Sequence, residues 1–446
     1  MAYPVVVVGA GPVGLAAAAE LVERDLDVVV LERGAAAGAA VSEWGHVRLF
    51  SQWSELVAPA AARLLDVRGW IRPVGDAYPT GAEWVRDYLV PLAGALGERV
   101  RTGAEVVGVA RRGRDRVVDD GRDTEPLTVH VRHADGREER ILARAVVDAS
   151  GTWVAPNPLG GDGLPALGER AAVDGGLLSY RGPDLSDPEV RERFAGRHVV
   201  VAGSGHSALT ALVSLTRLAD DTDGTTITWV LRRGAIGDTF GGGDADELPA
   251  RGRLGQAARS AVEAGRVRVV TGFRTEAVEP GPDGRVSLVS DAGNRIDGVD
   301  HVIALTGLRP DLAWLSELRL ELDATLQAPV KLAPMIDPNI HSCGSVSPHG
   351  VLELAHPEPG VYLAGMKSYG RAPTFLAMTG YEQIRSIAAD FAGDRASAER
   401  VELVLPESGV CGGSGGYDGD DVSGGCCGTS TGPELITLGV PVRTSS

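Results

Sequence analysis

The feature that most constrains this chain is a set of closely spaced glycines between an apolar run and a helix-forming run. Gly9, Gly11 and Gly14 follow residues 5–8, which are all valine, and they lead into the alanine-rich residues 15–22. The first glycine permits a tight turn, the second lets a ligand approach the backbone, and the third lets helix and strand pack closely. Because the N-terminus of such a helix offers free N–H groups to phosphates, the order predicts a nucleotide-binding βαβ unit.

An acidic residue at the end of the next apolar run narrows the range of possible ligands. Residues 28–31 form that run, and Glu32 follows the glycines at a spacing close to the roughly 20 residues typical of dinucleotide sites. Its carboxylate can accept hydrogen bonds from an unphosphorylated ribose, as FAD and NAD both have. The alternative is a glycine turn without a ligand. The residues expected to contact the nucleotide here are Gly9, Gly11, Pro12, Gly14, Glu32 and Arg33.

The same plan recurs further along the chain with a different charge. Gly203, Gly205 and Ala208 follow the apolar residues 198–202, and the next apolar run ends at Arg232 and Arg233. Arginine there would face a ribose that carries a 2′-phosphate, so we expect NADPH, with NADH also possible. Solvated surface arginines are the alternative, and His206 could instead be a surface or capping residue. The expected site comprises Gly203, Gly205, His206, Ser207, Arg232 and Arg233.

Strand-rich stretches follow each of these units. We expect strands at 106–110, 127–131 and 141–147, with a hairpin turn at Asp135-Gly136, and again at 286–289 and 299–304. These stretches end at Ser150-Gly151 and at Thr306-Gly307, which we include among the cofactor contacts. A last strand at 361–364 leads to Gly365 and to a helix at 374–391.

Taken together, these motifs resemble the superfamily of flavin-containing monooxygenases and pyridine-nucleotide-disulfide oxidoreductases. The resemblance covers roughly residues 4–395 and rests on both glycine turns, Asp148-Ala149-Ser150-Gly151-Thr152-Trp153, Thr306-Gly307-x-Arg309-Pro310 and Gly360-Val361-Tyr362-Leu363-Ala364-Gly365. It implies an α/β fold with two Rossmann-type domains. The FAD-binding domain would be discontinuous, residues 1–160 and 330–400, with an NAD(P)H-binding domain inserted at 161–329.

The resemblance also implies contacts around the flavin. Gly365 would contact the ribityl-phosphate side, and Lys367 and Arg371 could face the flavin or its phosphates, although solvated charge is the alternative. Trp44 and His46 lie in a loop that could cover the flavin, unless they only pack as ordinary aromatic residues. FAD would be the resident cofactor and the nicotinamide nucleotide the hydride source, so no catalytic side chain and no metal is expected.

Two departures limit what the resemblance implies about the reaction. Disulfide reductases of this superfamily use a Cys-x-x-Cys pair, and this sequence has none. Phe194-Ala195-Gly196-Arg197-His198 gives only the first half of the Phe-x-Gly-x-x-x-His fingerprint of class B monooxygenases. Oxygenation of a small substrate at sulfur, nitrogen or a ketone is therefore implied by the superfamily and not by a signature.

A narrower resemblance concerns flavoproteins of bacterial arsenic-resistance operons. It rests on Ser42-x-Trp44-Gly45-His46-Val47-Arg48-Leu49-Phe50-Ser51, on Leu248-Pro249-Ala250-Arg251-Gly252 and on a cysteine-containing tail. Residues 401–446 are rich in Gly and Ser, which predicts a flexible tail. Cys411, Cys426 and Cys427 in that tail are candidate thiols for a metalloid, and accidental placement is the alternative.

The charge and the first residues of the chain bear on partners and location. A formal net charge of -17 argues against nucleic acid and anionic membranes as partners. Residues 1–19 carry no charged side chain, but Gly9, Gly11 and Gly14 would break a spanning helix, so we expect a cytoplasmic protein. The expected partners are a small substrate and O2, and the oligomeric state stays open.

Three hypotheses remain at this point. The leading one is an FAD- and NAD(P)H-dependent monooxygenase. The second is an NAD(P)H-dependent flavoprotein of arsenic resistance whose tail thiols bind the metalloid. The third is a non-enzymatic flavin redox sensor that alters partner binding.

Overall fold

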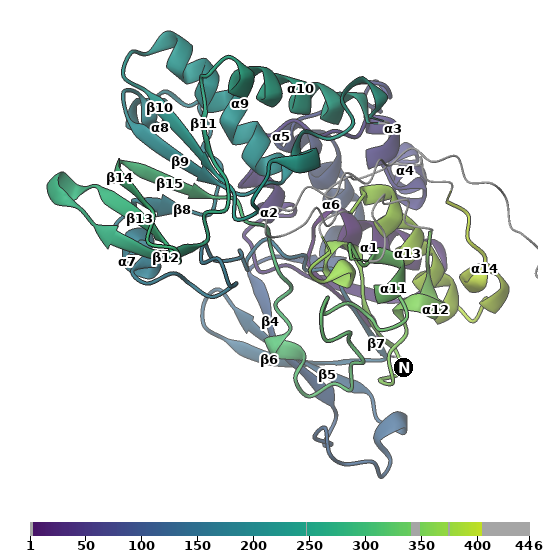
Figure 1. Cartoon of the computed structure of the whole chain (residues 1–446). Coiled ribbons are helices and arrows are strands. Elements are labelled where there is room, and N and C mark those ends of the chain that lie inside the picture. The colour runs from purple at the N-terminus through teal and green to yellow at the C-terminus, as the bar shows by residue number, and fades with distance from the viewer. Residues whose placement is uncertain (1–2, 247, 340–347, 373–374, 404–446) are drawn as a thin grey trace, which may run out of the picture.

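Two parallel β-sheets organise the molecule. The computed structural model describes residues 3–246, 248–339, 348–372 and 375–403 (Figure 1). The first sheet has the strand order β16-β7-β1-β2-β3 and the second has the order β11-β10-β9-β15-β8. Strand β16 follows the whole second sheet in the sequence, so the first sheet is built from two separated stretches of chain, with the second sheet's unit between them.

The strands have the following bounds. Those of the first sheet are β1 (Val5–Val8), β2 (Val28–Leu31), β3 (Val100–Arg101), β7 (Ala145–Asp148) and β16 (Val361–Leu363). Those of the second sheet are β8 (Leu178–Ser179), β9 (His198–Ala202), β10 (Thr226–Val230), β11 (Arg268–Val270) and β15 (His301–Ala304). Two antiparallel sheets contain β4 (Ala104–Arg111), β5 (Leu127–His133) and β6 (Glu138–Ala143), and β12 (Thr275–Pro280), β13 (Val286–Ser290) and β14 (Arg295–Val299).

The helices connect these strands and cover the sheets. They are α1 (Pro12–Glu23), α2 (Ala39–Ser42), α3 (Trp53–Leu56), α4 (Pro59–Asp66), α5 (Gly81–Trp84), α6 (Val90–Leu96), α7 (Glu169–Asp174), α8 (Pro188–Phe194), α9 (His206–Asp221), α10 (Pro249–Glu263), α11 (Ala333–Ile336), α12 (Val351–Leu354), α13 (Ala377–Phe391) and α14 (Arg395–Glu399). Within the described ranges, no helix combines the length and the apolar composition needed to cross a membrane.

Each parallel sheet lies between helices and a three-stranded antiparallel sheet. In β1, Val5 and Val7 pack with helices α1 and α13, whereas Val6 and Val8 pack with residues of β4, β5 and β6. In β9, Val199 packs with α9 and α10, whereas the next residue, Val200, packs with residues of β12, β13 and β14. Figure 1 shows α9 and α10 lying over the second sheet. Burial on both faces explains the unbroken apolar runs of these strands.

The structure divides two strands that the apolar pattern predicts as continuous. The expected strand 141–147 is the end of β6 and the start of β7, which belong to different sheets and meet at the exposed Arg144. The expected strand 299–304 divides in the same way between β14 and β15. The predicted hairpin is confirmed, because Gly136 has φ +84° between the paired strands β5 and β6. The last long helix begins at Ala377, not at residue 374.

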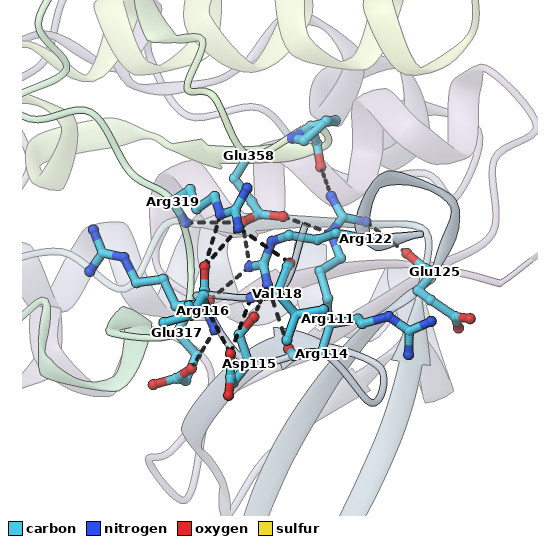
Figure 2. A network of polar contacts seen from close by, with 12 residues as sticks. Arg111, Arg114, Asp115, Arg116, Val118, Arg122, Glu125, Glu317, Arg319 and Glu358 are labelled. Atoms are coloured by element: carbon cyan, nitrogen blue, oxygen red, sulfur yellow. Dashed lines mark hydrogen bonds and ion pairs between the residues drawn. The ribbon is translucent and has the colours of Figure 1, made fainter. Parts of the chain in front are cut away.

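A buried charge network fixes the turn that precedes β16. The Glu358 carboxylate lies 2.7 Å from Nε of Arg111 and 2.8 Å from Nη2 of Arg122, and these three side chains are at most 4% exposed (Figure 2). The backbone N–H of Arg319 donates to the same carboxylate at 2.9 Å. Burial pushes the pKa of Glu358 upward, but the bonds from Arg122, Arg319 and Arg111 outweigh it, so the pKa lies below its ordinary value. The network therefore joins the β4–β5 hairpin to the chain that enters β16.

Candidate functional site

The carboxyl ends of four parallel strands open onto one large cavity. Its volume is about 750 Å³, and residues that follow β1, β2, β7 and β16 line it: Gly9, Glu32, Ser150 and Gly365. The volume lies within the range of roughly 300–1,000 Å³ that is common for ligand sites. Ligands of parallel α/β sheets bind at this edge.

In the first glycine turn, two glycines are needed for close packing and one leaves space for a ligand. Gly9 has φ +98°, and a Cβ there would lie 2.8 Å from the carbonyl oxygen of Ala149. A Cβ on Gly14 would lie 1.9 Å from the carbonyl oxygen of Gly9, so that glycine is needed for close packing of α1. A Cβ on Gly11 would meet nothing within 4 Å. Gly11 and Pro12 both line the cavity, which leaves room for a phosphate at the start of α1.

Glu32 is held in place by the backbone. One carboxylate oxygen accepts the N–H of Ala10 and the other accepts the N–H of Gly34, each at 2.7 Å. Each oxygen keeps a second lone pair, so the carboxylate can also accept a ribose hydroxyl. Glu32 and the exposed Arg33 both line the cavity, as expected for the adenosine side of a dinucleotide.

The opposite side of the cavity holds a buried ion pair. Nζ of Lys367 lies 2.7 Å from Oδ2 of Asp148 and donates to Oγ of Ser150 at 3.0 Å. The other Asp148 oxygen accepts the Ser150 hydroxyl at 2.6 Å. Lys367 and Ser150 line the cavity, and so does Trp314, whose ring centroid lies 4.8 Å from Nζ.

The second glycine turn repeats the arrangement of the first. Gly203 has φ +125°, and a Cβ there would lie 2.1 Å from the carbonyl oxygen of Leu305. A Cβ on Gly205 would meet nothing within 4 Å. Helix α9 begins at His206, directly after this open position. The second unit therefore has a packing glycine, Gly203, and an open position, Gly205, that correspond to Gly9 and Gly11 of the first.

His206, at the start of α9, and Arg251, in α10, belong to the unit built around the second sheet, and they contribute to the cavity wall. Both line it, and the His206 ring lies 5.3 Å from the Phe50 ring of the first unit. Burial, aided by the charge of Arg251, lowers the pKa of His206, which favours the neutral ring. The Arg251 guanidinium is buried and lies 2.7 Å from Oδ1 of Asp246. The cavity thus runs from the first glycine turn to the second unit.

Comparison with known proteins identifies the family. The family of pyridine nucleotide-disulphide oxidoreductases matches residues 3–358. This chain belongs to that family. The fold and both glycine turns agree with the assignment, and the oxidoreductase binds FAD and NAD(P)H.

Individual relatives differ in their activities. An indole-3-pyruvate monooxygenase of Oryza sativa subsp. japonica is 30% identical over 216 residues, which is 48% of this chain and 45% of the relative. The chain therefore matches less than half of that relative's length. The structure of a bacillithiol disulfide reductase from Bacillus cereus covers 88% of this chain and 99% of its own, with a TM-score of 0.65 and 19% identity. A variant of a flavin monooxygenase from Stenotrophomonas maltophilia covers 88% and 98%, with a TM-score of 0.55 and 21% identity. At these identities the two structures establish the fold alone.

The structure brings many of the predicted contacts together. The predicted residues that line the cavity are Gly9, Gly11, Pro12, Glu32, Arg33, Trp44, Ser150, Gly151, His206 and Gly365. The predicted residues that do not line it are Gly14, His46, Gly203, Gly205, Ser207, Arg232, Arg233, Thr306, Gly307 and Arg371. Gly14 and Gly203 serve packing instead.

Several of the outlying residues have other partners. Arg371 is exposed and donates to the Gln327 side chain at 2.9 Å, whereas Lys367, named with it as a possible flavin contact, lines the cavity. The flavin contact of Arg371 stays a prediction. Thr306 donates to the backbone of Asn157 at 2.8 Å, which ties the end of β15 to the chain leaving the first unit. Arg232 and Arg233 come after Leu231, one residue beyond the end of β10, at the carboxyl end of the second sheet.

Sequence reasoning did not assign a role to several residues of the cavity wall. Besides Arg251 and Trp314, these residues are Val47, Leu49, Phe50, Met366, Phe375 and Leu376. The narrower resemblance could have identified several of these residues, because its segments 42–51 and 248–252 both contribute to the cavity wall. Cys411, Cys426 and Cys427 lie outside the described residues. Among the residues that the structure does describe, no three His, Cys, Asp or Glu side chains form a metal-binding group.

Proposed function

We propose that this oxidoreductase uses NADPH to reduce bound FAD and then uses O2 to oxygenate a small substrate. The observation that carries the proposal is the continuity of the cavity, which joins the first glycine turn to His206 and Arg251 of the second unit. Flavin, hydride donor and substrate would then share one space. One oxygen atom would enter the substrate and the other would leave as water, with NADPH supplying two electrons.

The walls of the cavity suit such a reaction. Trp44, Phe50, Trp314 and Phe375 contribute aromatic surface between the two units. Apolar walls exclude water, which limits unproductive side reactions of an activated oxidant. They also favour a small substrate with apolar or soft character.

The chain's own residues have distinct roles in this scheme. When bound, FAD supplies the redox chemistry, and the protein supplies orientation and electrostatics. The open space at Gly11 and the N-terminus of α1 would hold the pyrophosphate, and Glu32 would accept a ribose hydroxyl. Burial lowers the pKa of His206 and so favours its neutral ring, and His206 would contact the nicotinamide nucleotide in that form.

Oxygenation is favoured over disulfide reduction by two further observations. The sequence contains no Cys-x-x-Cys pair to carry electrons from a flavin to a disulfide substrate. The 30% identity with a plant indole-3-pyruvate monooxygenase supports the same choice. We therefore infer that the substances that accept the electrons of the reduced flavin bind inside the cavity.

A second candidate function rests on the tail sequence. Cys411, Cys426 and Cys427 offer three thiols in a Gly- and Ser-rich segment. Trivalent arsenic prefers sulfur, as other soft centres do. In this alternative, the tail thiols bind arsenite or an organoarsenical and the flavin unit acts on it.

The test is a single-turnover experiment with isotopically labelled O2. The holoenzyme is reduced with NADPH without air and then mixed with labelled O2 and one of several substrates: an organic sulfide, an amine, a ketone or a trivalent organoarsenical. The proposal predicts labelled product with one of these classes and correspondingly less hydrogen peroxide. If every substrate leaves all electrons in hydrogen peroxide, the monooxygenase proposal fails.

A further inference from the structure

Lys367 and Asp148 form an almost fully buried ion pair at the wall of the cavity. The side chains are 1% and 0% exposed, and Nζ and Oδ2 are 2.7 Å apart. The Ser150 hydroxyl bridges the pair, because it accepts from Nζ at 3.0 Å and donates to Oδ1 of Asp148 at 2.6 Å. Burying an ion pair has a desolvation cost that often exceeds its gain, so stability alone gives no reason to keep it.

The strand order puts this pair on the side of the cavity where the flavin half of FAD would lie. In the first sheet, β1 lies between β2 on one side and β7 and β16 on the other. The glycine turn that would receive the pyrophosphate follows β1, and Glu32, which would receive the adenosine ribose, follows β2. The rest of the dinucleotide must therefore extend toward β7 and β16, whose ends carry Asp148 and Lys367.

The positive member of the pair is the one that faces the cavity. Lys367 and Ser150 line the cavity, whereas Asp148 stands behind them at the end of β7. A group in the cavity is therefore closer to the ammonium than to the carboxylate. Because Coulomb interactions weaken with distance, it experiences a net positive potential.

A buried hydrogen-bond network fixes the backbone that carries Lys367. The N–H of Gly365 donates to Oε1 of Gln383 at 2.8 Å, and Nε2 of Gln383 donates to Oγ of Ser368 at 2.9 Å. The Ser368 hydroxyl in turn donates to the carbonyl oxygen of Gly365 at 2.8 Å. Lys367 is thus held in position before any ligand binds.

We propose that the Lys367 ammonium, kept in place by Asp148, raises the reduction potential of the bound FAD. A hydride carries two electrons and one proton, so a flavin that accepts it from NAD(P)H gains one negative charge, while the nicotinamide ring gains one positive charge. A fixed cation nearby stabilises the reduced flavin more than the oxidised flavin. The inference rests on bound FAD and does not depend on the proposed oxygenation.

The test compares midpoint potentials of FAD in purified holoenzymes, measured by equilibration with reference dyes under anaerobic conditions. Lys367→Met removes the cation and leaves the anion, so the potential should become more negative. Asp148→Asn removes the anion and leaves the cation, so the potential should become more positive. Lys367→Arg should stay near the wild-type value.

Two further variants guard against indirect effects. Lys367→Met/Asp148→Asn has no uncompensated buried charge, and its potential should lie below the wild-type value and above that of Lys367→Met. Glu358→Gln disrupts a buried charge network that does not line the cavity, so it should destabilise the protein and leave the potential unchanged.

Opposite shifts for the two single variants would support the proposal, because a purely structural role moves both in the same direction. Shifts of the same sign, or no shift in any variant, would overturn it. Loss of FAD from all the Lys367 and Asp148 variants would overturn it as well, since the pair would then serve to retain the cofactor. A shifted potential in an enzyme that oxygenates no substrate would sink only the proposed function.

Discussion

Glu32 is hydrogen-bonded through its carboxylate to the backbone N–H of Ala10 at 2.7 Å. The bond joins the end of β2 to the glycine turn that follows β1, so the expected ribose acceptor and the expected phosphate site are linked directly. A ligand that bridges Gly11 and Glu32 is held at two points whose separation is fixed by the fold.

The open space at Gly11 leads to the first prediction. Gly11→Val places a branched side chain where a Cβ meets no protein atom within 4 Å, so the variant should fold and should exclude the pyrophosphate. We expect colourless protein with little FAD after purification, measured from the flavin absorbance of the denatured sample.

Gly205→Val is the matched control, because Gly205 has the same open space in the second unit. This variant should keep its FAD and should lose reduction by NADPH. A well-folded Gly11→Val protein that retains full FAD would show that the pyrophosphate lies elsewhere.

The second prediction concerns the choice of nicotinamide nucleotide. Arg232 and Arg233 follow β10, where the ribose of the second nucleotide is expected. A hydrogen bond to a charged group contributes roughly 1.5–3 kcal/mol, so losing one should lower the efficiency with NADPH about tenfold or more. The Arg232→Ala/Arg233→Ala double variant should lose the preference and keep its activity with NADH. Equal efficiencies of the two nucleotides in the wild-type enzyme would contradict this account.

The third prediction concerns stability at the Glu358 network. Glu358→Gln leaves Arg111 and Arg122 buried without their carboxylate, and loss of one partner of a buried ion pair costs about 3–5 kcal/mol. The free energy of unfolding at neutral pH, from denaturant titration, should fall by that amount.

The difference in the free energy of unfolding between wild type and Glu358→Gln should depend on pH in a defined direction. Because folding lowers the pKa of Glu358, its ionised form stabilises the protein above the ordinary glutamate pKa, and the stabilisation disappears as the pH falls through the lowered value. The gap between wild type and Glu358→Gln should therefore narrow in acid. A gap that stays constant down to strongly acidic pH would show that the carboxylate charge is not responsible.

The fourth prediction tests the tail thiols. A chain that ends after Pro406 lacks Cys411, Cys426 and Cys427 and keeps every described element up to α14. It should bind FAD and be reduced by NADPH as the full chain is, and it should no longer bind arsenite stoichiometrically. Arsenite binding by the truncated chain would point to Cys343, and absence of binding by the full chain would end the arsenic hypothesis.

Local patterns predicted the two glycine turns and Glu32 because strand, turn, helix and acid are adjacent in the sequence. They did not predict the division of residues 141–147 between two sheets, since both parts are apolar and only pairing with β5 or with β1 distinguishes them. They also did not predict the Lys367–Asp148 pair. Lys367 and Ser150 are 217 residues apart and meet only because β16 pairs with β7.

We expect FAD in the first unit to accept a hydride from a nicotinamide nucleotide held in the second unit. Anaerobic titration of the yellow holoenzyme with NADPH tests it most directly, with the flavin absorbance as the readout. The flavin should bleach fully at one equivalent of NADPH per FAD without any added partner protein, and it should not bleach in the Gly205→Val variant. Flavin that stays oxidised in the folded wild-type enzyme under excess NADPH and excess NADH would contradict it.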